Sequence, residues 1–285
     1  MEVKYYQIAG LRLCILSQFD TLDSDVTRPF LAPAGPVDVI CRIYSVDQLP
    51  CPKGVLRQEE TLMEVHQEGD TVYRGLMKRG RTDYRYMLSK IVPGQDIVLW
   101  ALESELSWSN QMGYIFLALG LGALLQARGR LVLHASVVET EQGAILFSAA
   151  SGTGKSTQAR LWESHMGARI INGDRCAVGF QDGKPAVFGV PMAGTSGISR
   201  NKTLPLRAMV ALGQAKENQI RQLRGGEALI KIGFCSVIDR WSPDSHRYAM
   251  DMLSRLMETV PVFSLQCLPN QEAVEMLADA LEAIQ

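Results

Sequence analysis

The sequence predicts a protein of the α+β or α/β class with a mostly-β N-terminal domain and a C-terminal domain that mixes strands and helices. Short β-like runs alternate with Pro and Gly turns in the first ~105 residues. Further on, a glycine-rich loop lies between an apolar strand pattern and a helical pattern, and two more helical patterns close the chain. These observations place the domains at 1–106 and 128–285, with a connecting buried helix at 107–127.

The composition excludes several classes of protein. Hydrophobic residues make up 47% and charged residues 21% of the 285 residues, which is typical of a globular protein with a substantial core rather than of a disordered chain. The formal net charge of -1 argues against a nucleic-acid partner. An anionic ligand must therefore be held by local features.

The cysteine spacing, the N-terminal residues and the length of the apolar stretches predict a cytoplasmic protein. The six cysteines are scattered without the spacing of a zinc or redox motif, which favours free thiols in a reducing compartment. The N-terminus has no basic, apolar pattern of a secretory signal. The apolar stretch at 112–125 is shorter than the roughly 20 residues of a membrane span. We therefore expect a buried helix and no membrane partner.

In the N-terminal domain, alternation and turn signals predict only strands, and no chemical motif stands out. Its role in recognition is a hypothesis from architecture alone. The expected strands are 5–16, 37–44, 71–77, 83–88 and 96–102.

The rest of the chain alternates strands and helices. Ser107 or Ser109 is the expected N-cap of the connecting helix, and Arg128 and Gly129 are its expected end. The segment 181–184 is a hairpin turn signal. The expected strands are 131–138, 144–147, 168–171, 176–180, 186–190, 206–212 and 260–265, and the expected helices are 154–164, 244–258 and 270–284.

The loop after strand 144–147 has the residue types that bind a polyphosphate. Glycines permit a backbone that turns its N–H groups inward, a lysine reaches the β/γ position, and a following hydroxyl binds Mg²⁺. Ala149 stands where the GxxxxGK[S/T] pattern has its first glycine. The sequence therefore predicts a site for ATP or another nucleoside triphosphate with Mg²⁺. The expected nucleotide-binding residues are Ser151, Gly152, Thr153, Gly154, Lys155, Ser156 and Thr157, with Ser156 also at the metal.

Two residues outside the loop are candidates for the chemistry. Asp174 comes at the end of the strand that follows the loop's helix, so it is expected to bind the metal or to act as general base. A turn aspartate that caps its own backbone is the alternative. His134 lies in the strand before the loop strand, where an imidazole can face the γ-phosphate. Position alone favours a core histidine.

Three separated motifs, at 133–138, 148–157 and 171–175, occur in an order that resembles HPr kinase/phosphorylase and its relatives with the phosphoenolpyruvate-carboxykinase-like fold. The resemblance covers about 128–285. It implies that His134 and Asp174 are catalytic, with Asp174 also at the metal. Lys155, expected at the β/γ phosphates from the loop motif, is the third catalytic candidate. In that family an Asp-Asp pair follows the loop, and here Gly173 replaces its first member.

The segment 189–202 looks like the substrate-side loop of HPr-kinase-like proteins from bacterial peptide-modification clusters. This resemblance implies that Arg200 or Lys202 stabilises the transferring charge and that Arg200 contacts the nucleotide. A solvated basic turn is the alternative. The acceptor-recognition signature of HPr kinase itself is absent from the sequence, so HPr is not the expected acceptor.

The expected function is an ATP-dependent kinase that transfers the γ-phosphate to a hydroxyl-bearing acceptor, with a serine of a peptide or small protein as one candidate. A small-molecule kinase and a nucleotide-binding regulatory module without turnover are the alternatives. Ala149 and Gly173 favour the module. A carboxykinase is disfavoured because no larger carboxylate-binding set is found.

Overall fold

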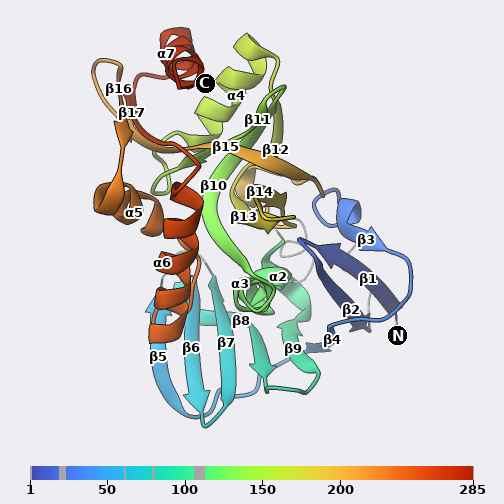
Figure 1. Cartoon of the computed structure of the whole chain (residues 1–285). Helices are drawn as coiled ribbons and strands as arrows, with labels where there is room; N and C mark the ends of the chain where they lie inside the picture. Colours follow the sequence, from blue (N-terminus) through green and yellow to red (C-terminus); the bar gives the residue numbers. More distant parts are fainter. Residues whose placement is uncertain (1, 19–23, 61, 79–80, 106–112, 285) are drawn as a thin grey trace.

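The computed structural model describes residues 2–18, 24–60, 62–78, 81–105 and 113–284. It contains two large sheets with helices packed against the second one, which confirms the mixed α/β class (Figure 1). The domain boundaries at 106 and 128 stay predictions.

The N-terminal sheet has nine strands within the described residues, in the order β3-β1-β2-β4-β9-β8-β7-β6-β5. The single strand predicted at 5–16 is wrong, because Ala9 and Gly10 have positive φ and form a tight turn between two antiparallel strands. The strands are β1 (Glu2–Ile8), β2 (Leu11–Ser17), β3 (Leu31–Ala32), β4 (Val39–Val46), β5 (Val55–Glu60), β6 (Met63–Glu68), β7 (Thr71–Lys78), β8 (Arg81–Ile91) and β9 (Ile97–Leu102). Two 3-10 turns flank them, η1 (Arg28–Phe30) and η2 (Glu103–Glu105).

The connecting segment differs from the continuous buried helix predicted at 107–127. Its described part holds two short helices, α2 (Tyr114–Ala118) and α3 (Leu121–Gln126). Gly120 breaks the helix because its φ is 70°, and a Cβ there would lie 2.8 Å from the Arg74 side chain. Both helices bury apolar side chains, as predicted. Residues 107–112, with the proposed N-caps Ser107 and Ser109, lie outside the described residues.

The second sheet carries the glycine-rich loop. Its order is β11-β10-β13-β14-β15-β17-β16, β12 pairs with β10, and β11 also pairs in parallel with β15. The hairpin predicted at 181–184 is confirmed, with Asp182 and Gly183 at positive φ. The strands are β10 (Arg130–Thr140), β11 (Gly143–Ser148), β12 (Arg169–Asn172), β13 (Arg175–Gln181), β14 (Lys184–Gly189), β15 (Thr203–Gln214), β16 (Gln219–Leu223) and β17 (Val262–Cys267).

Helices cover both faces of this sheet. One core packs α4 (Lys155–Met166) and α7 (Gln271–Glu282) against β11, β15 and β17, and another packs α5 (Gly225–Gly233) and α6 (Pro243–Met257) on the opposite side (Figure 1). A third core joins the N-terminal sheet, α2 and α3 to side chains from β10, β13 and β14. The N-terminal sheet is therefore packed directly against the sheet that carries the loop.

Five strands and α-helices of the described residues were not predicted: β3, β5, β6, β16 and α5. The charged residues of β5 hide its alternation, since five of its six residues are exposed. None of the described helices has the length and apolarity that a bilayer crossing requires.

Candidate active site

The glycine-rich loop connects the fully buried strand β11 to the N-terminus of α4, as predicted. Gly152 and Gly154 have φ of 82° and 107°, in the left-handed region that favours glycine. A Cβ at either position would meet no atom within 4 Å, so conformation rather than crowding requires these glycines. The loop thus brings backbone N–H groups and the positive end of the α4 dipole to one place.

Ala149 does not disturb this geometry. Gly is needed only where φ is positive, and Ala149 is not among the residues with positive φ. Its carbonyl accepts a hydrogen bond from the Lys155 ammonium at 2.9 Å. The departure from the glycine pattern therefore carries no weight against phosphate binding.

Lys155 is buried and its ammonium is held inside the loop. Nζ donates to the carbonyls of Ala149 and Ala150, at 2.9 and 3.1 Å. Burial lowers the pKa of Lys155, and the negative charge of Asp174 opposes this shift. The ammonium is thus fixed among the loop amides, where a phosphate oxygen is a better partner than a carbonyl.

Ser156 joins the start of α4 to the turn between β12 and β13. Its hydroxyl donates to the carbonyl of Gly173 at 3.5 Å, and the same carbonyl accepts from Ser136 at 2.8 Å. Asp174 is the next residue in the chain. This contact therefore links the Ser156 hydroxyl to the residue that precedes Asp174, whose carboxylate is the other group proposed for the metal.

Asp174 is the centre of a charged cluster. Its Oδ1 accepts from His134 Nε2 at 3.0 Å and its Oδ2 accepts from Arg175 Nη1 at 2.6 Å. Burial alone would raise the pKa of Asp174, but the His134 hydrogen bond and the charges of Arg175 and Lys155 outweigh it, so the pKa is lowered. Asp174 is an ionised carboxylate at neutral pH. Asp174 also contacts His134 on the neighbouring strand β10. An aspartate that only capped its own turn would not need this contact.

The same contact fixes which nitrogen of His134 carries a proton. Because the ionised carboxylate can only accept, Nε2 is the donor, and in the neutral tautomer Nδ1 is the nitrogen that can accept a proton. The strand register places His134 of β10 directly opposite Arg175 of β13. Its backbone N–H donates to Cys235 O at 2.8 Å. His134 is therefore a half-buried site residue rather than a core histidine.

Mg²⁺ fits this donor set. Magnesium at a phosphate site takes one or two protein oxygens and fills its other positions with phosphate and water. Ser156 supplies a hydroxyl, and each oxygen of Asp174 keeps a second lone pair beside its present hydrogen bond. The described residues contain no group of three or more His, Cys, Asp or Glu side chains arranged for a metal. Any metal at this site would therefore need the phosphates as ligands.

Gly173 is a steric requirement. A Cβ at this position would lie 2.0 Å from Ser196 Oγ and 2.4 Å from Ser196 Cβ. Ser196, in the turn η3 (Gly194–Ser196), is itself held by hydrogen bonds to Ala193 O and from Ile198 N. The space that an aspartate side chain would need is filled by this serine.

Arg200 is not brought to the phosphate loop. Its Nε donates to Ile170 O on β12 at 3.0 Å, and it lines a cavity with Arg169 and Lys202 that includes no loop residue. Lys202 is paired with Glu139. The strand carbonyl thus holds the guanidinium of Arg200 away from the loop, and its contact with the nucleotide stays a prediction.

Two cavities flank the loop. One of about 420 Å³ is lined by Gly152, Thr153, Gly154 and Thr157, together with residues at and just after the ends of β15 and β17. The other, of about 610 Å³, is lined by Ser151, His134 and Arg175 on one side and by β5, β6 and α2 on the other. The loop thus separates two spaces, and of the two only the larger one is lined by His134 and Arg175 of the charged cluster.

Arg175 is a site residue that the sequence did not reveal. It binds Asp174, it lines the larger cavity, and its Nε is buried without a partner among the described residues. Its position beside Asp174 in the sequence was the only signal. The strand pairing that turns both side chains toward His134 is a long-range feature.

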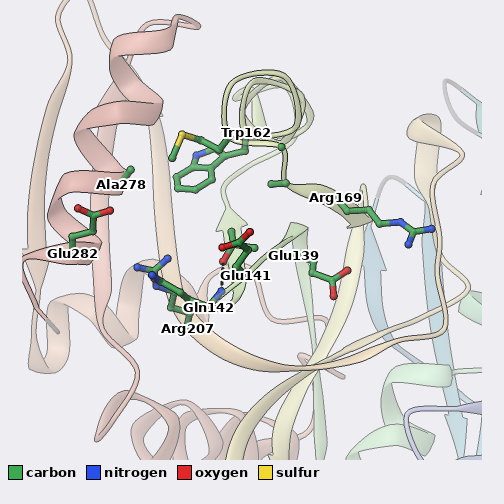
Figure 2. A pocket seen from close by; sticks show the side chains of 12 residues that line it. Glu139, Glu141, Gln142, Trp162, Arg169, Arg207, Ala278 and Glu282 are labelled. Atoms are coloured by element: carbon green, nitrogen blue, oxygen red, sulfur yellow. Dashed lines mark hydrogen bonds between the residues drawn. The ribbon is translucent and has the colours of Figure 1, made fainter.

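A third cavity, of about 560 Å³, lies at the far end of α4 (Figure 2). Figure 2 shows carboxylates of Glu141 and Glu282 and the guanidinium of Arg207 on its walls, with the indole of Trp162 beside them. None of the predicted site residues lines it. It is separate from the loop and its charged cluster.

Comparisons with known proteins add little to this geometry. No family model and no curated protein matches the chain. Among solved structures it is similar to the HPr(Ser) kinase/phosphatase from Coxiella burnetii, with 11% identity and a TM-score of 0.31 over 53% of this chain and 88% of that one. This is a weak fold-level resemblance, so the functional argument rests on the site.

Proposed function

We propose that this protein is an ATP-dependent phosphotransferase of the HPr-kinase-like group, with the phosphoenolpyruvate-carboxykinase-like fold in its second half. The observation that carries the proposal is the contact of Ser156 with Gly173, which joins the phosphate loop to the Asp174, His134 and Arg175 cluster. A loop that only bound nucleotide would need no such cluster.

The charges of the site suit a triphosphate in a chain of net charge -1. Lys155 and the loop amides are positioned for the β- and γ-phosphates, and the unpartnered Nε of Arg175 can donate to a transferring phosphoryl oxygen. Ser156 and Asp174 would hold Mg²⁺, which would neutralise phosphate charge when bound. The smaller cavity beside Gly152 and Thr157 is left for the nucleoside.

The acceptor hydroxyl is assigned to the larger cavity, beside His134. Phosphoryl transfer needs positioning and charge neutralisation more than a strong base, so a neutral imidazole is adequate. Nδ1 of His134 takes the hydroxyl proton, and Asp174 holds the required tautomer and stabilises the imidazolium that forms. The hydroxyl oxygen bonds to the γ-phosphorus and ADP leaves.

Three measurements on the purified protein and on Lys155→Ala test the proposal. We expect Mg²⁺-dependent ATP binding by calorimetry, at least tenfold weaker binding by the variant, and transfer of labelled γ-phosphate to a hydroxyl compound that the variant does not support. Equal ATP affinity of the two proteins would contradict the phosphate site. ATP binding without transfer or hydrolysis under any condition would favour the regulatory module.

A further inference from the structure

The larger cavity is the only one of the two beside the loop whose walls come from the N-terminal sheet. Gln58 and Glu60 of β5 lie on one wall, and the segment 234–238 with Arg240 lies on another. Hydrogen bonds from His134 N to Cys235 O and from Val237 N to Val132 O tie that segment to β10. The cavity is therefore a built space between the charged cluster and the N-terminal sheet.

Polar contacts join the two walls at the rim. Arg240 N donates to Gln58 Oε1 at 2.9 Å, and Arg240 Nε lies 3.3 Å from Glu60 Oε1. Because these contacts cross between β5 and the segment before α6, they fix the width of the opening. The N-terminal sheet thus shapes the space in which the acceptor would sit.

An exposed apolar strip begins at this cavity and continues beyond it. Phe234 lines the cavity, yet it is 69% exposed, and Ile230 is 73% exposed. These are the two highest values among the large apolar side chains that the structure describes. They are four residues apart at the end of α5, so they share one helical face. Exposed apolar pairs of this kind mark interaction surfaces.

The position of the apolar strip distinguishes a small-molecule acceptor from an extended peptide. A small molecule of a few hundred Å³ would be contained in the cavity and would not reach Ile230, which is not among its lining residues. Ile230 lies about one helical turn, roughly 5–6 Å, from Phe234. An extended peptide advances about 3.3 Å per residue and places residues i and i+2 on the same face, so two apolar side chains two residues apart match this spacing.

We infer that the acceptor is an extended peptide segment whose hydroxyl enters the larger cavity toward His134 and whose neighbouring apolar side chains lie on Phe234 and Ile230. This inference rests on the proposed phosphotransferase function and adds its substrate class and the surface that reads it. The N-terminal sheet supplies the opposite wall through Gln58 and Glu60. A second copy of this chain is the other occupant that such a strip could bind.

The test uses the full chain and an array of blocked 11-residue peptides, each with one central serine. In one set leucine occupies the second and fourth positions on one side of the serine, so that both leucines share a face of the extended peptide, and in the matched set aspartate replaces both leucines. Transfer of labelled phosphate is measured for the wild type, for Ile230→Glu/Phe234→Glu and for Ile284→Glu. Ile284 is a matched control, 46% exposed near the C-terminus. ATP titrations and sedimentation accompany each protein.

We expect the leucine peptides to be phosphorylated at least tenfold more efficiently than the aspartate peptides, and the double variant to lose this preference while Ile284→Glu retains it. Wild-type preference in the double variant would overturn the inference. Transfer to glycerol or free serine but to no peptide would also overturn it. The same holds if sedimentation shows a dimer for wild type and Ile284→Glu but a monomer for the double variant. Absence of ATP binding by the wild type would instead show failure of the proposed function.

Discussion

Replacing Gly173 with alanine tests the steric explanation for the missing aspartate. The new Cβ would lie 2.0 Å from Ser196 Oγ, well inside van der Waals contact. Inserting a methyl group into a packed site typically costs about 1–3 kcal/mol. Gly173 is not among the residues with positive φ, so alanine also restricts the unfolded chain and returns about 0.4–1 kcal/mol. The net expected loss of unfolding free energy is about 1–2 kcal/mol.

The sign of this effect should reverse when the clash is removed. Ser196→Gly alone costs about 1 kcal/mol, because the hydroxyl bonds to Ala193 O and from Ile198 N are lost. In that background the remaining neighbour of the new Cβ is Ala193 O at 3.7 Å, an ordinary van der Waals contact, so only the stabilising entropic effect of about 0.4–1 kcal/mol remains. The coupling between the two positions is therefore expected to be about 1–3 kcal/mol.

Urea unfolding of the four proteins, followed by tryptophan fluorescence, measures this cycle. Gly226→Ala is the control, because a Cβ at Gly226 meets nothing within 4 Å and its φ is not positive. An equal cost of Gly173→Ala with and without Ser196→Gly would refute the reasoning. The same conclusion would follow if Gly173→Ala were as harmless as the control.

Four further predictions concern the site. Asp174→Asn should reduce transfer about 10²–10⁴-fold while ATP affinity by calorimetry changes far less; wild-type turnover would remove its assigned role. Because the pKa of Asp174 is lowered, its ion pairs stabilise the native state at pH values above the ordinary pKa of 3.8, and this stabilisation is lost as pH falls below 3.8 toward the folded-state pKa. The acid unfolding curves of wild type and Asp174→Asn should therefore converge below pH 3.8. Because the pKa of Lys155 is lowered and phosphate binds its protonated form, ATP affinity should decline as pH rises toward 10.5, with a flatter profile in Lys155→Ala. Ala149→Gly should cost about 0.5–1 kcal/mol of stability in urea unfolding without raising ATP affinity, since no positive φ needs relief.

The local features of the fold followed from sequence because their determinants are adjacent in the chain. Two consecutive residues with positive φ, Asp182 and Gly183, make the β13–β14 turn. The side chains of Ser242 and Asn270 cap α6 and α7 at their N-termini. The phosphate loop belongs to the same class, since left-handed glycines and the helix start lie within a few residues.

Features that depend on contacts between distant residues could not be predicted from the sequence. Gly120 breaks the predicted helix because Arg74, 46 residues earlier in the numbering, fills the space at its α-carbon. Ser196 occupies the place of a side chain at Gly173. Arg200 is held by a carbonyl of β12 rather than turned to the loop. No local pattern carries such information, because each depends on how strands pair.

Arg74 also explains why the N-terminal sheet belongs to the active-site argument. Its buried guanidinium binds Asp239 at 2.6 Å, on the segment that forms one wall of the larger cavity, while its stem packs at Gly120. Breaking such a buried pair leaves an uncompensated charge and costs about 3–5 kcal/mol. The strands of the N-terminal sheet and the wall opposite them are therefore coupled through this buried ion pair, the contacts of Arg240 with β5 and a shared apolar core. A substitution in β7 can thus alter the cavity beside His134 without touching the phosphate loop.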